Sequence, residues 1–178
     1  MRINKTIFLM LFALLVTTGC TKLYNKTEVS TGHIAPLVKK IQPAVVTVVA
    51  YDVNRKVSNL GSGFFIDKKG YLITNYHVLK GAYAADVKTY DGKAYPVELV
   101  VAENIPSDLI KVRVKIPGSS IHWIPVTETN PSIADRIVVV GSPLGLEQTV
   151  SIGIVSAIRE LPVLGKVFQL SAPISPGS

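Results

Sequence analysis

The chain has 178 residues, 48% of them hydrophobic, so it is long and apolar enough to form a packed core, and disorder of the whole chain is excluded. Lysine and arginine outnumber aspartate and glutamate by 19 to 12, which gives a formal net charge of +7. The basic residues are scattered in short pairs such as Lys39-Lys40 and form no stripe with aromatic residues, so we expect no nucleic-acid partner.

Residues 1–19 have the pattern of a secretory signal peptide, because Arg2 and Lys5 precede an apolar stretch that ends in small residues. The only cysteine, Cys20, follows a Thr-Thr-Gly sequence. This placement resembles the bacterial lipobox, in which the cysteine is lipidated and becomes the mature N-terminus. We therefore expect Cys20 to carry a lipid anchor. Ordinary signal cleavage nearby and a retained anchor are the alternatives.

The next segments are a polar stretch and a short amphipathic one. Residues 20–32 lack apolar periodicity, which predicts a linker. In residues 33–41 the apolar side chains recur at the spacing of one helical face, and Pro43 follows them. This pattern predicts one short helix that ends before the proline.

Beyond Pro43 nearly every apolar run is short, rich in β-branched residues and bounded by turn residues. Such spacing indicates an all-β barrel or sandwich. Asp91-Gly92 predicts a hairpin turn whose two central residues both have positive φ. A proline- and glycine-containing stretch over residues 117–130 predicts a boundary between two groups of strands. The expected strands are residues 44–51, 61–66, 71–75, 87–90, 95–102, 109–116, 136–140, 149–158 and 167–170.

Two residues at strand boundaries suggest acyl-transfer chemistry, which requires an activated hydroxyl, a base and a carboxylate that orients the base. His77 lies two residues after the end of the expected strand 71–75, and an imidazole can take up and return a proton near neutral pH. Asp108 opens a later strand, from where its carboxylate can point into a cleft. Either residue alone is more often a surface, core or cap residue. Their order along the chain favours two members of a Ser-His-Asp triad.

The last residues of the chain, Ser-Pro-Gly-Ser, have the pattern of the approach to a nucleophilic serine. Pro176 and Gly177 can form the tight turn that directs a backbone N–H at a developing oxyanion. We expect neither a cofactor nor a metal site, because His33 and His122 have no partner at ligand spacing.

Taken together, the ordered motifs resemble those of the trypsin-like serine proteases of the bacterial HtrA/Deg family. The resemblance implies two perpendicular β-barrels with the catalytic site between them, the second barrel being truncated in this chain. It also implies ATP-independent cleavage of unfolded proteins in the cell envelope. The matching segments are residues 41–46, 61–66, 71–78, 107–112, 141–146 and 149–157.

The resemblance assigns roles to three residues: His77 as the base, Asp108 as its partner and Gly177 as an oxyanion-hole donor. Ser178 matches a position that is commonly asparagine in the family, and the nucleophilic serine would come next. On this reading residues 33–178 form a protease domain that is incomplete at its C-terminus, and we expect the 178-residue chain to be inactive.

The sequence thus predicts an all-β serine endopeptidase on the periplasmic side of the bacterial cell envelope, anchored to a membrane by lipid. Its expected substrates are unfolded polypeptides, and the sequence leaves a homo-oligomer open. The alternative is a lipid-anchored, noncatalytic pseudoprotease that binds exposed peptide segments. The residues that follow Ser178 would distinguish the two hypotheses.

Overall fold

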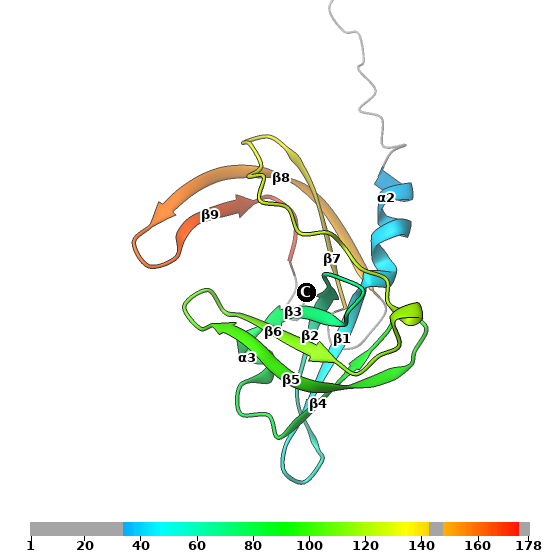
Figure 1. Ribbon diagram of the computed structural model, residues 1–178. Helices are drawn as coiled ribbons and strands as arrows, with labels where there is room; N and C mark the ends of the chain where they lie inside the picture. The colour runs from blue at the N-terminus through cyan, green and yellow to red at the C-terminus, as the bar shows by residue number, and fades with distance from the viewer. Residues whose placement is uncertain (1–33, 143–147, 175–178) are drawn as a thin grey trace, which may run out of the picture. The chain divides into compact units, whose positions relative to one another are not determined.

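A computed structural model describes residues 34–142 and 148–174 (Figure 1). The predicted signal peptide, the linker, Cys20 and Gly177 lie outside these residues. Within them, no helix has the length and apolar character needed to cross a membrane. The elements are α2 (Ile34–Ile41), η2 (Gln42–Ala44), β1 (Val45–Tyr51), β2 (Val57–Phe65), β3 (Tyr71–Asn75), α3 (Tyr76–Leu79), β4 (Ala84–Lys88), β5 (Ala94–Asn104), β6 (Leu109–Val114), η3 (Gly118–Ser120), β7 (Arg136–Gly141), β8 (Thr149–Leu161) and β9 (Gly165–Leu170).

The first six strands form a closed barrel in the order β1-β2-β3-β6-β5-β4, and all of their pairings are antiparallel. Closure pairs β1 with both β2 and β4, so the barrel has no open strand edge. Its interior holds the largest buried side chains of the described residues, including Phe65 and Leu72. Removal of this apolar surface from water is the main source of the barrel's stability.

Strand β6 shows how the sequence pattern produces the barrel wall. Ile110, Val112 and Val114 are 4%, 0% and 2% exposed, whereas the alternating Lys111 and Arg113 lie on the outer side. Period-two alternation of this kind places one face in the core and one in water. The alternation of apolar and basic residues along the sequence of β6 therefore matches its two faces.

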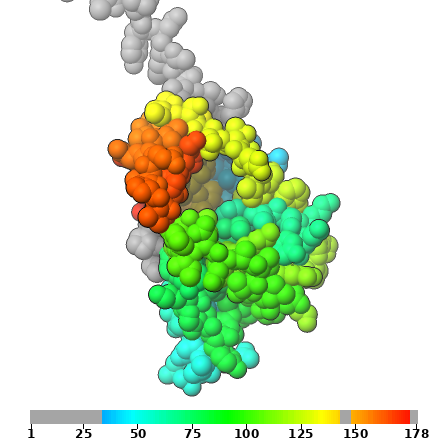
Figure 2. Space-filling view, turned by 60° about the vertical axis from the view of Figure 1, so that its left-hand side comes forward, coloured from blue at the N-terminus to red at the C-terminus, as the bar shows by residue number. Residues whose placement is uncertain are grey.

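The remaining strands form a three-stranded sheet in the order β7-β8-β9. A hydrogen bond of 2.7 Å between the buried hydroxyls of Thr47 and Ser142 links β1 to the end of β7, and the Ser142 N–H donates to the Ser62 hydroxyl at 2.8 Å. The Gln148 amide donates to the carbonyls of Gln42 and Val45. In the space-filling view the β8–β9 hairpin (orange) lies above the barrel strands (cyan to green) (Figure 2).

Several expected boundaries differ from those of the structure. Strand β2 begins at Val57 and not at residue 61, because Val57 pairs with Tyr51 across the hairpin. Strand β4 ends at Lys88, before the expected end at residue 90. In both cases cross-strand hydrogen bonding sets the boundary, whereas apolar runs locate only the strand.

The β4–β5 hairpin is present at Asp91-Gly92, but its predicted turn geometry is wrong. Of these two residues only Gly92 has positive φ, at 82°. The Gly92 N–H bonds to the Thr89 carbonyl, which makes Tyr90 and Asp91 the central residues of the turn. The Asp91 carboxylate accepts a hydrogen bond from the Thr89 hydroxyl at 2.6 Å and forms an ion pair with the Lys93 ammonium at 2.8 Å. One left-handed glycine that follows a turn is a common alternative for closing a hairpin.

Candidate active site

His77 lies on α3, the short helix that directly follows β3. Its neighbour Val78 is 2% exposed and anchors the helix in the barrel core. Helix α3 packs closely on β2 because Gly61 carries no side chain, and a Cβ at that position would collide with Val78. The His77 side chain, by contrast, is 62% exposed. Tight packing of the helix therefore fixes the backbone of His77 and leaves the imidazole accessible.

Asp108 occupies the turn immediately before β6 and adopts a left-handed conformation, with φ of 53°. Aspartate is among the few residues other than glycine that visit this region. The Asp108 N–H donates to the Ile105 carbonyl, and the Asp108 carbonyl accepts from the Tyr76 N–H. The turn thus brings Asp108 beside the start of α3.

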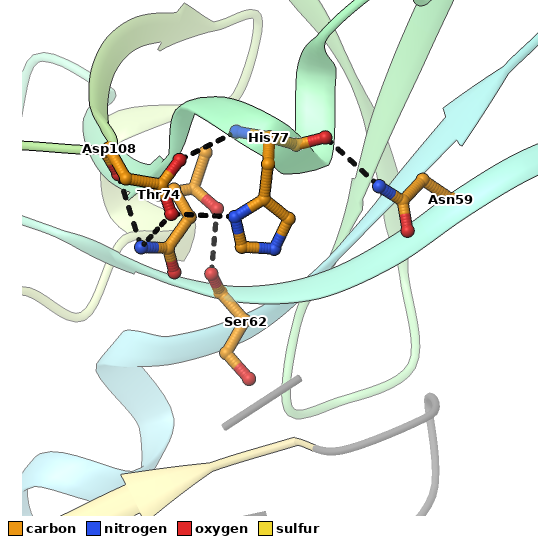
Figure 3. A network of polar contacts seen from close by, with 6 residues as sticks. Asn59, Ser62, Thr74, His77 and Asp108 are labelled. Carbon is orange, nitrogen blue, oxygen red and sulfur yellow. Dashed lines mark hydrogen bonds and ion pairs between the residues drawn. The ribbon is translucent and has the colours of Figure 1, made fainter. Parts of the chain in front are cut away.

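The carboxylate of Asp108 contacts His77 twice (Figure 3). Oδ2 lies 2.6 Å from Nδ1 of the imidazole, and Oδ1 accepts the main-chain N–H of His77 at 2.8 Å. An ionised carboxylate can only accept hydrogen bonds, so Nδ1 carries the proton and Nε2 of the neutral ring holds the lone pair. The structure therefore brings the two predicted residues together in a geometry suited to a general base.

Opposing effects act on the ionisation of Asp108. Burial of the carboxyl group raises its pKa, but hydrogen bonds from the His77 main chain and ring, the charge interaction with His77 and a bond from Asn75 together outweigh burial. The pKa of Asp108 therefore lies below its ordinary value of 3.8. The carboxylate is ionised at neutral pH and can stabilise an imidazolium.

Sequence reasoning missed two asparagines beside this pair. Asn75 donates from Nδ2 to the carbonyl of Asp108 at 3.1 Å and to Oδ2 of Asp108 at 3.2 Å. Asn59 donates from β2 to the carbonyl of His77 at 3.0 Å. The position of Asn75 at the end of β3, two residues before His77, was the one available signal. The contact of Asn59 depends on strand packing that no local pattern reveals.

The segment that leads to the predicted terminal turn is attached to β8. Ser171 exchanges two hydrogen bonds with the main chain of Ile154, at 3.1 and 2.9 Å, and the Ser151 hydroxyl donates to the carbonyl of Pro173 at 2.7 Å. Gly153 permits this approach, because a Cβ there would collide with the Ala172 backbone. These contacts hold the segment as far as Pro173, and Gly177 lies outside the described residues.

A separate cavity of about 530 Å³ lies between the start of β1 and the β4–β5 turn, and neither His77 nor Asp108 lines it. In the part of the chain that the structure describes, no group of three or more histidine, cysteine, aspartate or glutamate side chains could hold a metal ion. Because His77 and Asp108 have the geometry of a general base and its orienting carboxylate, the polar contacts around them are the candidate site.

Comparison with known proteins gave a match to the trypsin-like peptidase domain over residues 61–178. The serine endoprotease DegS of Salmonella typhimurium is 35% identical over 141 residues, which cover 75% of this chain and 39% of DegS. The chloroplastic protease Do-like 1 of Arabidopsis thaliana is 31% identical over 140 residues, which cover 71% of this chain and 30% of that protein. The chain spans less than half the length of these relatives.

Solved structures give a similar result. A serine endoprotease from Yersinia pestis matches with a TM-score of 0.60 and 33% identity, covering 67% of this chain and 43% of that one. The structure of an HtrA-type protease with a tripeptide matches with a TM-score of 0.70 and 28% identity, covering 80% of this chain and 47% of that one.

Proposed function

Since the chain belongs to the trypsin-like peptidases and, among them, to the HtrA/Deg serine proteases, we propose that it provides the general base and the orienting carboxylate of a serine endopeptidase. The observation that carries this proposal is the 2.6 Å contact between His77 Nδ1 and Asp108 Oδ2. The second contact, from the His77 N–H to Oδ1, supports it because both carboxylate oxygens are then directed at one residue.

In the proposed reaction His77 Nε2 takes the proton of the serine hydroxyl that the family resemblance places directly after Ser178. The serine oxygen then forms a bond to the carbonyl carbon of the scissile peptide. Asp108 stabilises the resulting imidazolium, which returns its proton to the leaving amine. Water, activated by the same imidazole, hydrolyses the acyl-enzyme. Gly177 is the proposed oxyanion-hole donor. One such donor stabilises the transition state by roughly 3 kcal/mol in comparable sites.

The proposed substrates are unfolded or misfolded polypeptides, and the proposed location is the periplasmic side of the bacterial cell envelope. The signal-like residues 1–19 and the lipobox-like placement of Cys20 support a lipid anchor, followed by the linker 20–32 and the protease domain 33–178. The matching HtrA-type protease structure contains a tripeptide, which supports a peptide as a ligand of this fold.

The test is release of dye from labelled unfolded casein by the complete product of the gene that encodes this chain. We expect Asp108→Asn to lower kcat by about 10⁴-fold and His77→Ala by at least as much, because each removes a member of a unit that acts together. His122→Ala and Asp91→Asn alter exposed residues of the same types away from the site, and we expect both variants to retain wild-type turnover.

The polypeptide that stops at Ser178 is a further control. It carries His77 and Asp108 without a following serine, and we expect it to release no dye. Turnover by this polypeptide that a serine-directed inhibitor abolishes would contradict the assignment of the nucleophile. If the complete product binds unfolded casein but releases no dye, the noncatalytic hypothesis would replace ours. Turnover that His77→Ala leaves at the wild-type rate would refute the role of His77.

A further inference from the structure

Asn75 stands where a helix cap is expected, but its side chain does not cap the helix. It directly precedes α3, with φ of −74° and ψ of 142°, and its side chain makes no capping hydrogen bond. Asparagine is among the preferred residues at such positions because its oxygen accepts an N–H of the first turn. Here the N–H of His77 bonds to Oδ1 of Asp108 instead. The Asn75 amide is therefore directed to another partner.

That partner is Asp108, which Asn75 contacts at two atoms. Nδ2 of Asn75 lies 3.1 Å from the Asp108 carbonyl oxygen and 3.2 Å from Oδ2, the oxygen that faces the imidazole. One amide group thus joins the main chain and the side chain of the same aspartate. A bridge of this kind restricts rotation of the carboxylate about both of its side-chain torsions.

Such a restriction matters because the Asp108 side chain is 41% exposed. A carboxylate that water can reach has several competing donors, so a fixed donor is needed to keep one oxygen on Nδ1. In the described residues His77 is the titratable group in contact with Asp108. Among the residues that the structure describes, the main-chain N–H of His77 donates to Oδ1, and Asn75 donates to Oδ2 beside the imidazole.

We propose that Asn75 is a positioning residue, whose amide holds the Asp108 carboxylate in the orientation that keeps the proton of His77 on Nδ1. An effect of Asn75 on turnover rests on the function proposed above, whereas its effect on the orientation and ionisation of Asp108 does not. Because an amide donor favours the ionised carboxylate, its loss should make Asp108 easier to protonate.

The first experiment follows the side-chain carboxyl carbon of Asp108 by NMR across an acid titration of the 178-residue chain. Asn75→Ser is the main variant, because serine is also a preferred helix cap but its side chain is too short to bridge both atoms of Asp108. We expect the titration midpoint of Asp108 to rise in Asn75→Ser and to rise further in Asn75→Asp, which places a like charge beside the carboxylate.

Asn59→Ala is the matched control, since it removes a similar amide hydrogen bond to His77 without touching Asp108. We expect it to leave the Asp108 midpoint unchanged. If Asn75→Ser keeps the wild-type amide spectrum and the wild-type midpoint, the proposal is overturned. If Asn75→Ser loses the folded spectrum, Asn75 is required for the fold and not only for the orientation of Asp108, and the proposal is likewise overturned.

The second experiment measures casein hydrolysis by the complete gene product. Misplacement of the base should lower kcat of Asn75→Ser by roughly 10- to 100-fold while KM stays constant. A shifted Asp108 midpoint without hydrolysis by the wild type would retain Asn75 as a positioning residue and refute the proposed function. Hydrolysis by Asn75→Ser at the wild-type rate, with an unshifted midpoint, would refute the role of Asn75 and retain the function.

Discussion

The closed barrel and the three-stranded sheet bury their apolar faces to very different extents. In the barrel, Val48, Leu72 and Val112 are each 0% exposed. On β8, the face that carries Ile152 and Ile154 is open, with 47% and 41% of these side chains exposed. The residues that contact each other at the candidate site, His77 and Asp108, both belong to the barrel and its connections. The better-packed region thus carries the elements that require fixed geometry.

The largest contrast in stability should appear on truncation of one side chain in each region. We expect Leu72→Ala to lower the free energy of unfolding by about 3 kcal/mol, because it leaves a cavity in a closed core. Ile152→Ala removes a side chain that is already half exposed, so about 1 kcal/mol or less should be lost. Urea denaturation of both variants measures the difference. Equal losses would show that the two regions do not differ in packing.

The contact between α3 and β2 provides a second test within the barrel. Gly61→Ala should destabilise the protein by about 1–3 kcal/mol, since its Cβ collides with Val78. Gly118→Ala is the matched control, because its nearest neighbour lies 3.4 Å away and we expect a small change. If the collision is the cause, Val78→Ala combined with Gly61→Ala should lose less than the sum of the single variants. Additive losses would contradict this explanation.

The hydroxyl pair that joins the two regions should make a smaller contribution. Thr47→Val removes the 2.7 Å hydrogen bond to Ser142 and keeps the volume of the side chain. We expect a loss of about 1 kcal/mol, the usual contribution of a buried hydrogen bond. Hydrogen exchange should quicken at β7 more than at β3, because the bond ties β7 to the barrel. Equal changes on the two strands would contradict a linking role.

The smallest expected effect is a pH dependence of stability. The pKa of Asp108 is lower in the folded protein than its ordinary value of 3.8. The ionised carboxylate therefore stabilises the folded state, and this stabilisation is fully present above pH 3.8. The contribution is lost as the pH falls through the folded pKa. Because the carboxylate is partly exposed, the effect should be slight. The measurement is the free energy of unfolding of the wild type minus that of Asp108→Asn at a series of pH values. We expect this difference to shrink below pH 3.8, and a difference that grows there would contradict the prediction.

Much of the architecture could be predicted from the sequence because it follows from periodicity. The all-β fold class and the HtrA/Deg resemblance are confirmed by the strand pattern and by the comparisons. The predicted trypsin-like double barrel with a truncated second barrel is confirmed as one closed barrel followed by a three-stranded sheet. The start of β2 at Val57 and the turn at Asp91-Gly92 could not be predicted, since both depend on hydrogen bonds across the hairpins. The catalytic roles of His77, Asp108 and Gly177, the lipidation of Cys20 and the domain limits stay predictions.

The local geometry of the candidate site was the least accessible part. The left-handed backbone of Asp108 and the amide contacts of Asn59 and Asn75 arise where strands distant in sequence meet. The residue types at these positions favour turns and helix caps, but they do not identify which group each side chain will hydrogen-bond. The order of the motifs predicts the proximity of His77 and Asp108, whereas the hydrogen-bond donors around them depend on how the strands pack in three dimensions.

The double contact of Asp108 has a consequence for any study of acid inactivation. Its Oδ1 closes the first turn of α3 while its Oδ2 faces the imidazole ring. A single protonation event would therefore weaken the reactive pair and loosen the helix that carries it. Loss of the contact with the imidazole and loosening of α3 should coincide as the pH falls through the pKa of Asp108.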